Sequence, residues 1–180
     1  ADIKMIYLST DFVFDGEKDG QYSEEDIPNP INWYGQTKYW GEEAIKGESL
    51  VLRISFPFGY KTSIKKDLIW TLTDLLSKAQ SVKLVSDQII TPTFIDDIVY
   101  GLDFLMDKKE TGLINLVGNN SLSPYEIGIA IAREFSLREG KIETTTRKNL
   151  YHNRARRPFK LVLKNDKLRN LGFEMTNLFD

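Results

Sequence analysis

Residues 6–16 read Ile-Tyr-Leu-Ser-Thr-Asp-Phe-Val-Phe-Asp-Gly, and residues 34–38 read Tyr-Gly-Gln-Thr-Lys. The apolar run that ends at Leu8 predicts a buried strand, and three oxygen-bearing side chains, Ser9 to Asp11, follow it at once. In an open parallel sheet, ligands bind at the carboxyl ends of the strands. These three residues are therefore the first candidates for a binding site.

A tyrosine and a lysine come next in the chain. Asn32 is a suitable N-cap for a helix over residues 32–46, and this helix places Tyr34 and Lys38 on one face because they are four residues apart. An ammonium group near a phenol favours the phenolate and lowers the phenol's pKa, which is about 10 when unperturbed. Such a pair is suited to proton transfer near neutral pH. The spacing alone is not specific, since a chain with eight tyrosines contains it readily by chance.

Composition excludes several classes of protein. The chain has 180 residues, of which 41% are hydrophobic, so it suits one domain or a large part of a bigger one. A formal charge of −2 argues against nucleic-acid binding. With no cysteine and one histidine, no metal site is expected. No apolar run approaches the ~20 residues of a membrane span, so we expect a cytoplasmic protein without a membrane partner.

The rest of the chain alternates between strand and helix patterns. Strands are predicted over residues 50–55, 82–85, 113–117 and 141–146. Helices are predicted after three caps, Ser63, Thr93 with Asp96, and Ser123 with Glu126, and over residues 166–171. This alternation predicts an α/β fold, a partial Rossmann-like doubly wound parallel sheet with a small α+β substrate-binding portion.

Taken together, these motifs resemble the extended short-chain dehydrogenase/reductase family, most closely its dTDP-4-dehydrorhamnose reductase branch. That branch typically reads Ser-Thr-Asp-Tyr-Val-Phe-Asp-Gly, then an acidic residue and Pro-x-Asn-x-Tyr-Gly-x-(Ser/Thr)-Lys-x-x-Gly-Glu. Here Ser9–Gly16, Asp26 and Pro30–Glu42 hold those positions, and Phe12 replaces the usual tyrosine of the first motif.

The resemblance implies the NAD(P)H-dependent reduction of a 4-keto deoxysugar nucleotide, such as dTDP-4-dehydro-L-rhamnose to dTDP-L-rhamnose. It implies that Tyr34 is the proton donor and that Lys38 lowers its pKa and binds the nicotinamide ribose. Thr10 would hydrogen-bond the keto oxygen. Leu8, Tyr34 and Lys38 would contact the cofactor, NADPH or NADH.

The resemblance also assigns residues to the nucleotide sugar. Thr10, Asp11 and Phe56 hold substrate-contacting positions, and Phe56 stands where family members often have tryptophan. Arg156 and Arg157 match an Arg-Arg-Pro segment of the branch, and guanidinium groups suit a pyrophosphate. A solvated charged face is the alternative for this cluster. Substrate-binding elements are expected mainly in residues 86–95 and 118–180.

Two alternatives stay open. One is another nucleotide-sugar epimerase or dehydratase of the extended family, because the motif does not separate these enzymes. The other is a non-catalytic regulatory subunit similar to that of methionine adenosyltransferase.

The family's Gly-rich dinucleotide fingerprint has no match, because no two of the 12 glycines are separated by a single residue. We therefore expect residues 1–180 to form a single incomplete domain, the C-terminal two-thirds of a reductase. The isolated chain is expected to be inactive and to self-associate or form a homo-oligomer through the exposed edge of its first strand.

Overall fold

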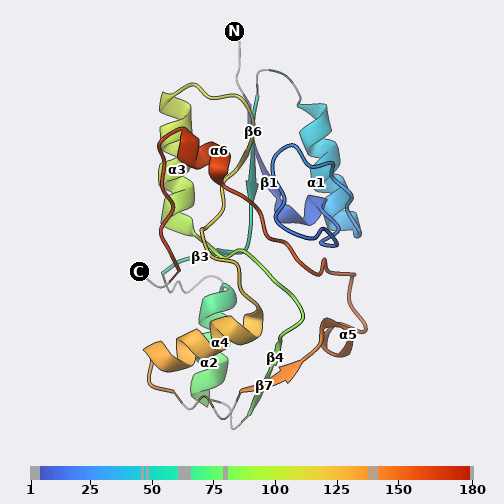
Figure 1. The fold of residues 1–180 in the computed structure, drawn as a ribbon, viewed down its shortest axis with the longest axis vertical. Coiled ribbons are helices and arrows are strands. Elements are labelled where there is room, and N and C mark those ends of the chain that lie inside the picture. The colour runs from blue at the N-terminus through green and yellow to red at the C-terminus, as the bar shows by residue number, and fades with distance from the viewer. Residues whose placement is uncertain are drawn as a thin grey trace.

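The computed structural model describes residues 5–45, 47, 49–60, 66–78, 81–137, 139 and 142–178. Its larger part is built on a three-stranded parallel sheet in the order β1, β2, β6 (Figure 1). The strands are β1 (Ile6–Thr10), β2 (Leu50–Ile54) and β6 (Gly112–Asn115). Leu52 pairs with Leu8 on one side and with Ile114 on the other. The predicted parallel α/β sheet is confirmed.

Helices cover both faces of this sheet, as expected of a doubly wound fold. A short 3-10 helix, η1 (Asp11–Val13), continues β1, and α1 (Trp33–Ala44) leads to β2. Figure 1 shows α1 on one side of the sheet, with α3 (Ile95–Asp107) and α6 (Asp166–Asn170) on the other. The core on the α3 side contains Leu50, Leu52, Ile98, Leu105, Ile114, Leu116, Leu168 and Met175.

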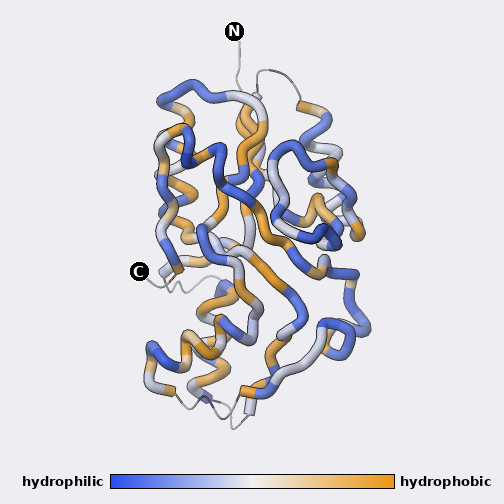
Figure 2. Tube along the Cα trace, viewed as in Figure 1, coloured by the Kyte–Doolittle hydropathy of each residue, from blue (hydrophilic) through white to orange (hydrophobic). Residues whose placement is uncertain are grey.

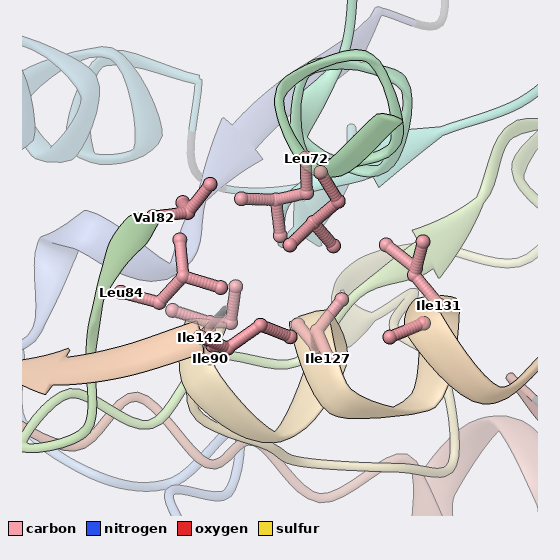
Figure 3. Close-up of a cluster of buried hydrophobic side chains, with 9 residues drawn as sticks. Leu72, Val82, Leu84, Ile90, Ile127, Ile131 and Ile142 are labelled. Carbon is pink, nitrogen blue, oxygen red and sulfur yellow. The ribbon is translucent and has the colours of Figure 1, made fainter. Parts of the chain in front are cut away.

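A smaller part lies at the carboxyl end of the sheet, in the lower half of Figure 1. Its elements are the strands β4 (Val82–Val85) and β7 (Ile142–Thr145) and the helices α2 (Leu68–Lys78), α4 (Pro124–Glu134) and α5 (Arg147–Leu150). Aliphatic side chains from α2, α4 and both strands meet in one buried cluster (Figure 3). A two-residue pairing of β3 (Pro57–Phe58) with β5 (Thr93–Phe94) lies in the segments that connect the two parts.

Hydrophobic residues follow this arrangement along the chain. Figure 2 shows them in orange along the central strands and through the lower helices, whereas many loops are blue. Within the described residues, no helix is long and apolar enough to cross a bilayer. The same residues contain no cluster of three or more His, Asp or Glu side chains placed to hold a metal ion.

Of the two predicted capping boxes, one is confirmed and one is wrong. At the start of α4, Ser123 Oγ accepts from the Glu126 amide at 3.1 Å, and the Ser123 amide donates to the Glu126 carboxylate at 2.7 Å. The box predicted at Thr93 does not form. Thr93 is paired within β5 and its hydroxyl donates to the Thr91 carbonyl, so α3 begins after Phe94 without a side-chain cap. Ser63 lies outside the described residues.

The prediction that the first strand is buried is wrong for its amino-terminal half. Ile6 and Leu8 are 37% and 44% exposed, whereas Ser9 and Thr10 are buried. Among the described strands β1 pairs with β2 alone, so it forms one edge of the sheet. Its apolar side chains therefore have few neighbours.

Candidate functional site

A cavity of about 600 Å³ opens at the carboxyl ends of β1 and β2. All eight predicted site residues line it, although they come from four separate segments of the chain. They are Leu8, Thr10, Asp11, Tyr34, Lys38, Phe56, Arg156 and Arg157. The parallel sheet explains part of this convergence, because β1 and β2 end side by side and deliver Thr10 and Ile54 to one edge.

Thr10 and Asp11 line the cavity at the end of β1, and Asp11 is bonded to Ser55, a buried residue that follows β2. The Thr10 hydroxyl donates to Asp11 Oδ1 at 3.0 Å and accepts from the Phe12 amide at 3.3 Å, which caps η1. The Ser55 hydroxyl donates to Asp11 Oδ2 at 2.6 Å. Burial raises the pKa of Asp11 to about 6, although the bonds from Ser55 and Thr10 act in the opposite direction.

Tyr34 and Lys38 reach the cavity from the first turns of α1. Asn32 caps this helix by accepting from the Gly35 amide at 2.8 Å, as predicted. The Lys38 ammonium donates to the Leu8 carbonyl at 2.6 Å and lies 4.5 Å from the centre of the Tyr7 ring. Tyr34 is 54% exposed, so its hydroxyl is open to a ligand in the cavity.

Close backbone contact explains why glycine follows Tyr34. A Cβ atom at Gly35 would lie 2.1 Å from the carbonyl oxygen of Phe12, so any larger residue would push α1 away from η1. The glycine therefore fixes how near Tyr34 comes to the end of β1.

A buried ion pair holds the other end of α1 against the sheet. Arg53 on β2 donates to both oxygens of Glu42 at 2.9 and 2.7 Å, and the Ser9 hydroxyl adds a bond to the same carboxylate. Both charged side chains are at least 95% buried. The bidentate geometry fixes α1 to β1 and β2 in one position.

One wall of the cavity is aromatic. The Phe12 ring lies 5.7 Å from the Tyr34 ring in an edge-to-face arrangement and 6.2 Å from the Phe56 ring. Phe56 has a φ of +38°, which a bulky residue rarely adopts. Strained backbone of this kind is frequent at ligand sites.

The arginine segment, residues 154–160, contributes Arg154, Arg156 and Arg157 to the lining of the cavity. Arg156 is exposed and Arg157 is half-buried, with its guanidinium 4.5 Å from the centre of the Tyr151 ring. The Asn32 side-chain amide donates to the Arg156 carbonyl at 3.0 Å, which ties this segment to the start of α1. Arg147 donates to the Arg157 carbonyl at 2.7 Å.

The segment Asp87-Gln88-Ile89-Ile90-Thr91-Pro92-Thr93 is bonded to the arginine segment and the residues that follow it. The Ile89 amide donates to the Phe159 carbonyl and the Leu161 amide donates to the Ile89 carbonyl, both at 3.0 Å. The buried Gln88 side chain donates to the Pro158 carbonyl at 3.4 Å.

Sequence reasoning missed four residues of this site. Arg154 lines the cavity, Ser55 bonds Asp11, and Glu42 and Arg53 form the buried ion pair. Glu42 belongs to the motif Pro30–Glu42, and Arg154 lies two residues before Arg156, so both carried a signal in the sequence. Nothing in the pattern indicated Ser55 or Arg53, because their bonds to Asp11 and Glu42 join segments that are distant in the sequence.

The family profile described as "RmlD substrate binding domain" matches residues 1–178. This chain belongs to that family. The resemblance to dTDP-4-dehydrorhamnose reductases that the motifs predicted is thereby confirmed.

Two curated relatives illustrate the range of the family. The chain is 34% identical over 134 residues to the probable low-salt glycan biosynthesis reductase Agl14 of Haloferax volcanii. The aligned region covers 71% of this chain and 44% of that protein. It is 32% identical over 177 residues to the methionine adenosyltransferase 2 subunit beta of Rattus norvegicus, which covers 93% of the chain and 52% of that protein. The chain thus spans about half the length of the curated relatives that it matches.

Among solved structures, the chain is similar to the dTDP-4-dehydrorhamnose reductase of Bacillus anthracis in complex with NADP. The TM-score is 0.86 at 26% identity, over 97% of this chain and 62% of that one. The sheet described above is therefore Rossmann-like, as predicted.

Proposed function

We propose that the protein containing this chain is an NAD(P)H-dependent reductase of a 4-keto deoxysugar nucleotide, with dTDP-4-dehydro-L-rhamnose as the first substrate to test. One observation carries the proposal. Thr10, Tyr34 and Lys38 line the same cavity as Arg156 and Arg157, so proton-transfer groups and candidate diphosphate-binding groups share one site. The similarity to a dTDP-4-dehydrorhamnose reductase solved in complex with NADP also supports a reductase function.

The residues along β1 and in the first turns of α1 fit the nicotinamide end of a cofactor. Lys38 and the Leu8 carbonyl stand at the cavity beside the exposed Tyr34 hydroxyl, and Lys38 is the candidate partner of the nicotinamide ribose. When bound, NADPH or NADH supplies the hydride that reduces the keto carbon. Tyr34 donates its phenolic proton to the keto oxygen, and the charge of Lys38 stabilises the phenolate that remains.

The other residues orient the substrate. Thr10 lies at the end of β1 and is the candidate donor to the keto oxygen, and Asp11, which adjoins it, holds its hydroxyl in this structure. The aromatic wall with Phe56 covers the apolar face of the sugar ring. Arg156 and Arg157 are suited to the diphosphate, because a guanidinium matches phosphate oxygens with two parallel donors.

The test is the turnover of the complete polypeptide with NADPH and dTDP-4-dehydrorhamnose. Tyr34→Phe should lower the rate by about 10² to 10⁴, because this change removes the general acid and keeps the ring. Tyr100→Phe is the matched control, since Tyr100 lies exposed on α3 outside the cavity. Product analysis separates reduction from epimerisation or dehydration. An undiminished rate in Tyr34→Phe would remove this residue from the mechanism.

A second candidate is a binding subunit without turnover. The similarity to the methionine adenosyltransferase 2 subunit beta, over 93% of this chain, favours it. The same assay separates the two candidates, because a binding subunit should leave the keto sugar nucleotide unchanged.

A further inference from the structure

The Thr10 hydroxyl has a single proton, and in this structure that proton is already used. It is donated to Asp11 Oδ1 at 3.0 Å, while the oxygen accepts from the Phe12 amide at 3.3 Å. A hydroxyl offers one donor and two acceptor positions. Thr10 therefore presents only an acceptor position to the cavity. A keto oxygen is itself only an acceptor, so the arrangement shown does not match a ketone.

The direction of the Thr10 O–H bond is set by the carboxyl group of Asp11, which accepts its proton. Its carboxyl group is 1% exposed and receives the hydroxyls of Thr10 and Ser55, one on each oxygen. Among the described residues, no lysine, arginine or histidine lies within ion-pair distance of it. Because Ser55 is fully buried, its bond to the carboxyl is not readily exchanged for water, whereas Thr10 lines the cavity.

Other charged or titratable groups surround this carboxyl at greater distance. On β2 the nearest is Arg53, whose guanidinium is paired with Glu42 of α1. Those that share the cavity with Asp11 are Tyr34 and Lys38 on α1, and Arg154, Arg156 and Arg157 on the arginine segment.

We propose that Asp11 is a positioning residue that acts as a proton gate, so that only its neutral carboxyl frees the Thr10 hydroxyl to donate to a keto group. In the neutral form, the carboxyl O–H donates to Thr10 Oγ, Ser55 continues to donate to the other carboxyl oxygen, and the Thr10 proton turns to the ligand. No covalent bond forms or breaks apart from the protonation itself. This proposal rests on the proposed reductase function for its ligand.

The ionised form has the opposite preference. With Asp11 charged, the free acceptor position of Thr10 matches the hydroxyl of the alcohol product. The site should therefore prefer ketone when Asp11 is neutral and alcohol when it is charged. Because the pKa of Asp11 is raised to about 6, this exchange falls within an accessible range of pH.

The proposal predicts proton uptake on binding. If only the neutral form binds ketone, apparent affinity falls about tenfold for each pH unit above the pKa, because the competent fraction falls in that proportion. At about pH 7.5, binding one ketone should then take up about one proton. Binding the alcohol should take up none.

Two variants separate a gate from a structural contact. Asp11→Asn should donate permanently from its amide to Thr10 while still accepting from Ser55, so ketone affinity should lose its pH dependence and exceed that of the wild type at high pH. Ser55→Ala removes a bond that lowers the Asp11 pKa, so the fall in affinity should move to higher pH. Asp19→Asn, on the exposed loop, is the matched control and should leave the profile unchanged.

The experiment is calorimetric titration of the complete polypeptide, loaded with NADP⁺, with dTDP-4-dehydrorhamnose and with dTDP-rhamnose, in buffers of different ionisation enthalpy. We expect proton uptake for the ketone alone, and its loss in Asp11→Asn. Equal proton uptake for both ligands, or an unchanged pH profile in Asp11→Asn, would overturn the gate.

A second readout does not depend on the proposed reaction. Titration of the Asp11 carboxyl carbon by NMR in the ligand-free protein should show a midpoint well above that of an ordinary aspartate, moved higher by Ser55→Ala. An ordinary midpoint would overturn the gate even if turnover is observed. If the midpoint is raised but neither sugar nucleotide binds, the proposed function and with it the ketone gate are wrong, while the raised pKa stands.

Discussion

Asp11 is a residue whose burial should show in the stability of the protein. Its pKa is raised from 3.8 to about 6, so the folded chain binds this proton more tightly than the unfolded chain. The free energy of unfolding should therefore fall as pH rises from about 4 to about 6. Asp11→Asn cannot ionise and should be more stable than the wild type at neutral pH, by up to about 3 kcal/mol.

Urea unfolding of both proteins at neutral and at acidic pH measures this difference. The two should have similar stability below about pH 3, where Asp11 is largely protonated in both the folded and the unfolded state. Equal stability at neutral pH would show that the carboxyl group is better solvated than its burial indicates.

Arg157 carries a second prediction about a single side chain. If it binds the diphosphate, Arg157→Ala should weaken dTDP binding by about one to two decades, because a hydrogen bond to a charged group contributes about 1.5 to 3 kcal/mol. Calorimetric titration of the complete polypeptide measures the loss. Arg169→Ala on α6 is the control for a general loss of positive charge. Equal affinity in wild type and Arg157→Ala would favour the alternative of a solvated charged face.

The roles of single residues were predictable where they depend on neighbours close in the sequence. Asn32 was recognised as a cap, and Tyr34 and Lys38 as one helix face, because these features depend on residues three or four positions apart. The prediction at Thr93 was wrong because it also depended on a local pattern. Thr93 and Asp96 have the residue types and spacing of a capping box, but Thr93 pairs with β3 as part of β5 and does not cap the helix.

At the scale of elements, α1 is the helix that organises the site, and the Glu42–Arg53 pair fixes it to the sheet. Arg53→Met would leave the Glu42 carboxylate buried without its partner, and losing one member of a buried pair costs about 3 to 5 kcal/mol. The double variant Glu42→Leu with Arg53→Met should recover much of this loss, because no uncompensated charge remains.

Denaturant unfolding of the two single variants and the double variant measures the coupling. The surface pair of Lys18 and Asp26 is a suitable comparison, since exposed pairs contribute little. If Arg53→Met lost no more stability than Lys18→Met, the pair would not clamp α1.

Elements were predictable where periodicity and caps agree. The helix that begins at Ser123 has both, and the structure gives it a complete capping box. The strand pairing of β4 with β7 was not predictable, because residues 82–85 and 142–145 are 60 positions apart and carry no mutual signal. The burial of β1 was overestimated because an apolar strand has the same sequence pattern at the centre and at the edge of a sheet, and β1 lies at the edge.

For the whole molecule, the parallel sheet explains why a linear motif could predict a site. Thr10 and Phe56 are distant in sequence, yet the parallel pairing of β1 with β2 brings the strand ends together. The hydrogen bond from Asn32 to the Arg156 carbonyl spans 124 positions and joins two segments that line the cavity. This contact was not predictable from the sequence. It depends on the hydrogen bonds that join residues 88 and 89 to the backbone of residues 158–161.

The same architecture yields a prediction for the isolated 180-residue chain. Its first strand has one free edge among the described residues, with Met5, Ile6 and Leu8 between 37% and 50% exposed. An apolar strand edge pairs readily with other chains. The chain should therefore self-associate as its concentration rises. It should also fail to bind NADPH usefully, because its sequence lacks the Gly-x-Gly turn that receives a pyrophosphate.

Light scattering over a concentration series and fluorescence titration with NADPH measure the two effects, with intact mass spectrometry to verify the species. Ile6→Lys places a charge on the free edge without touching the cavity, so it should reduce association and leave cofactor binding as weak as before. A wild-type chain that stays monomeric would contradict the first half. Micromolar NADPH binding by a verified 180-residue species would contradict the second, and would mean that Leu8, Tyr34 and Lys38 hold the cofactor without a glycine-rich turn.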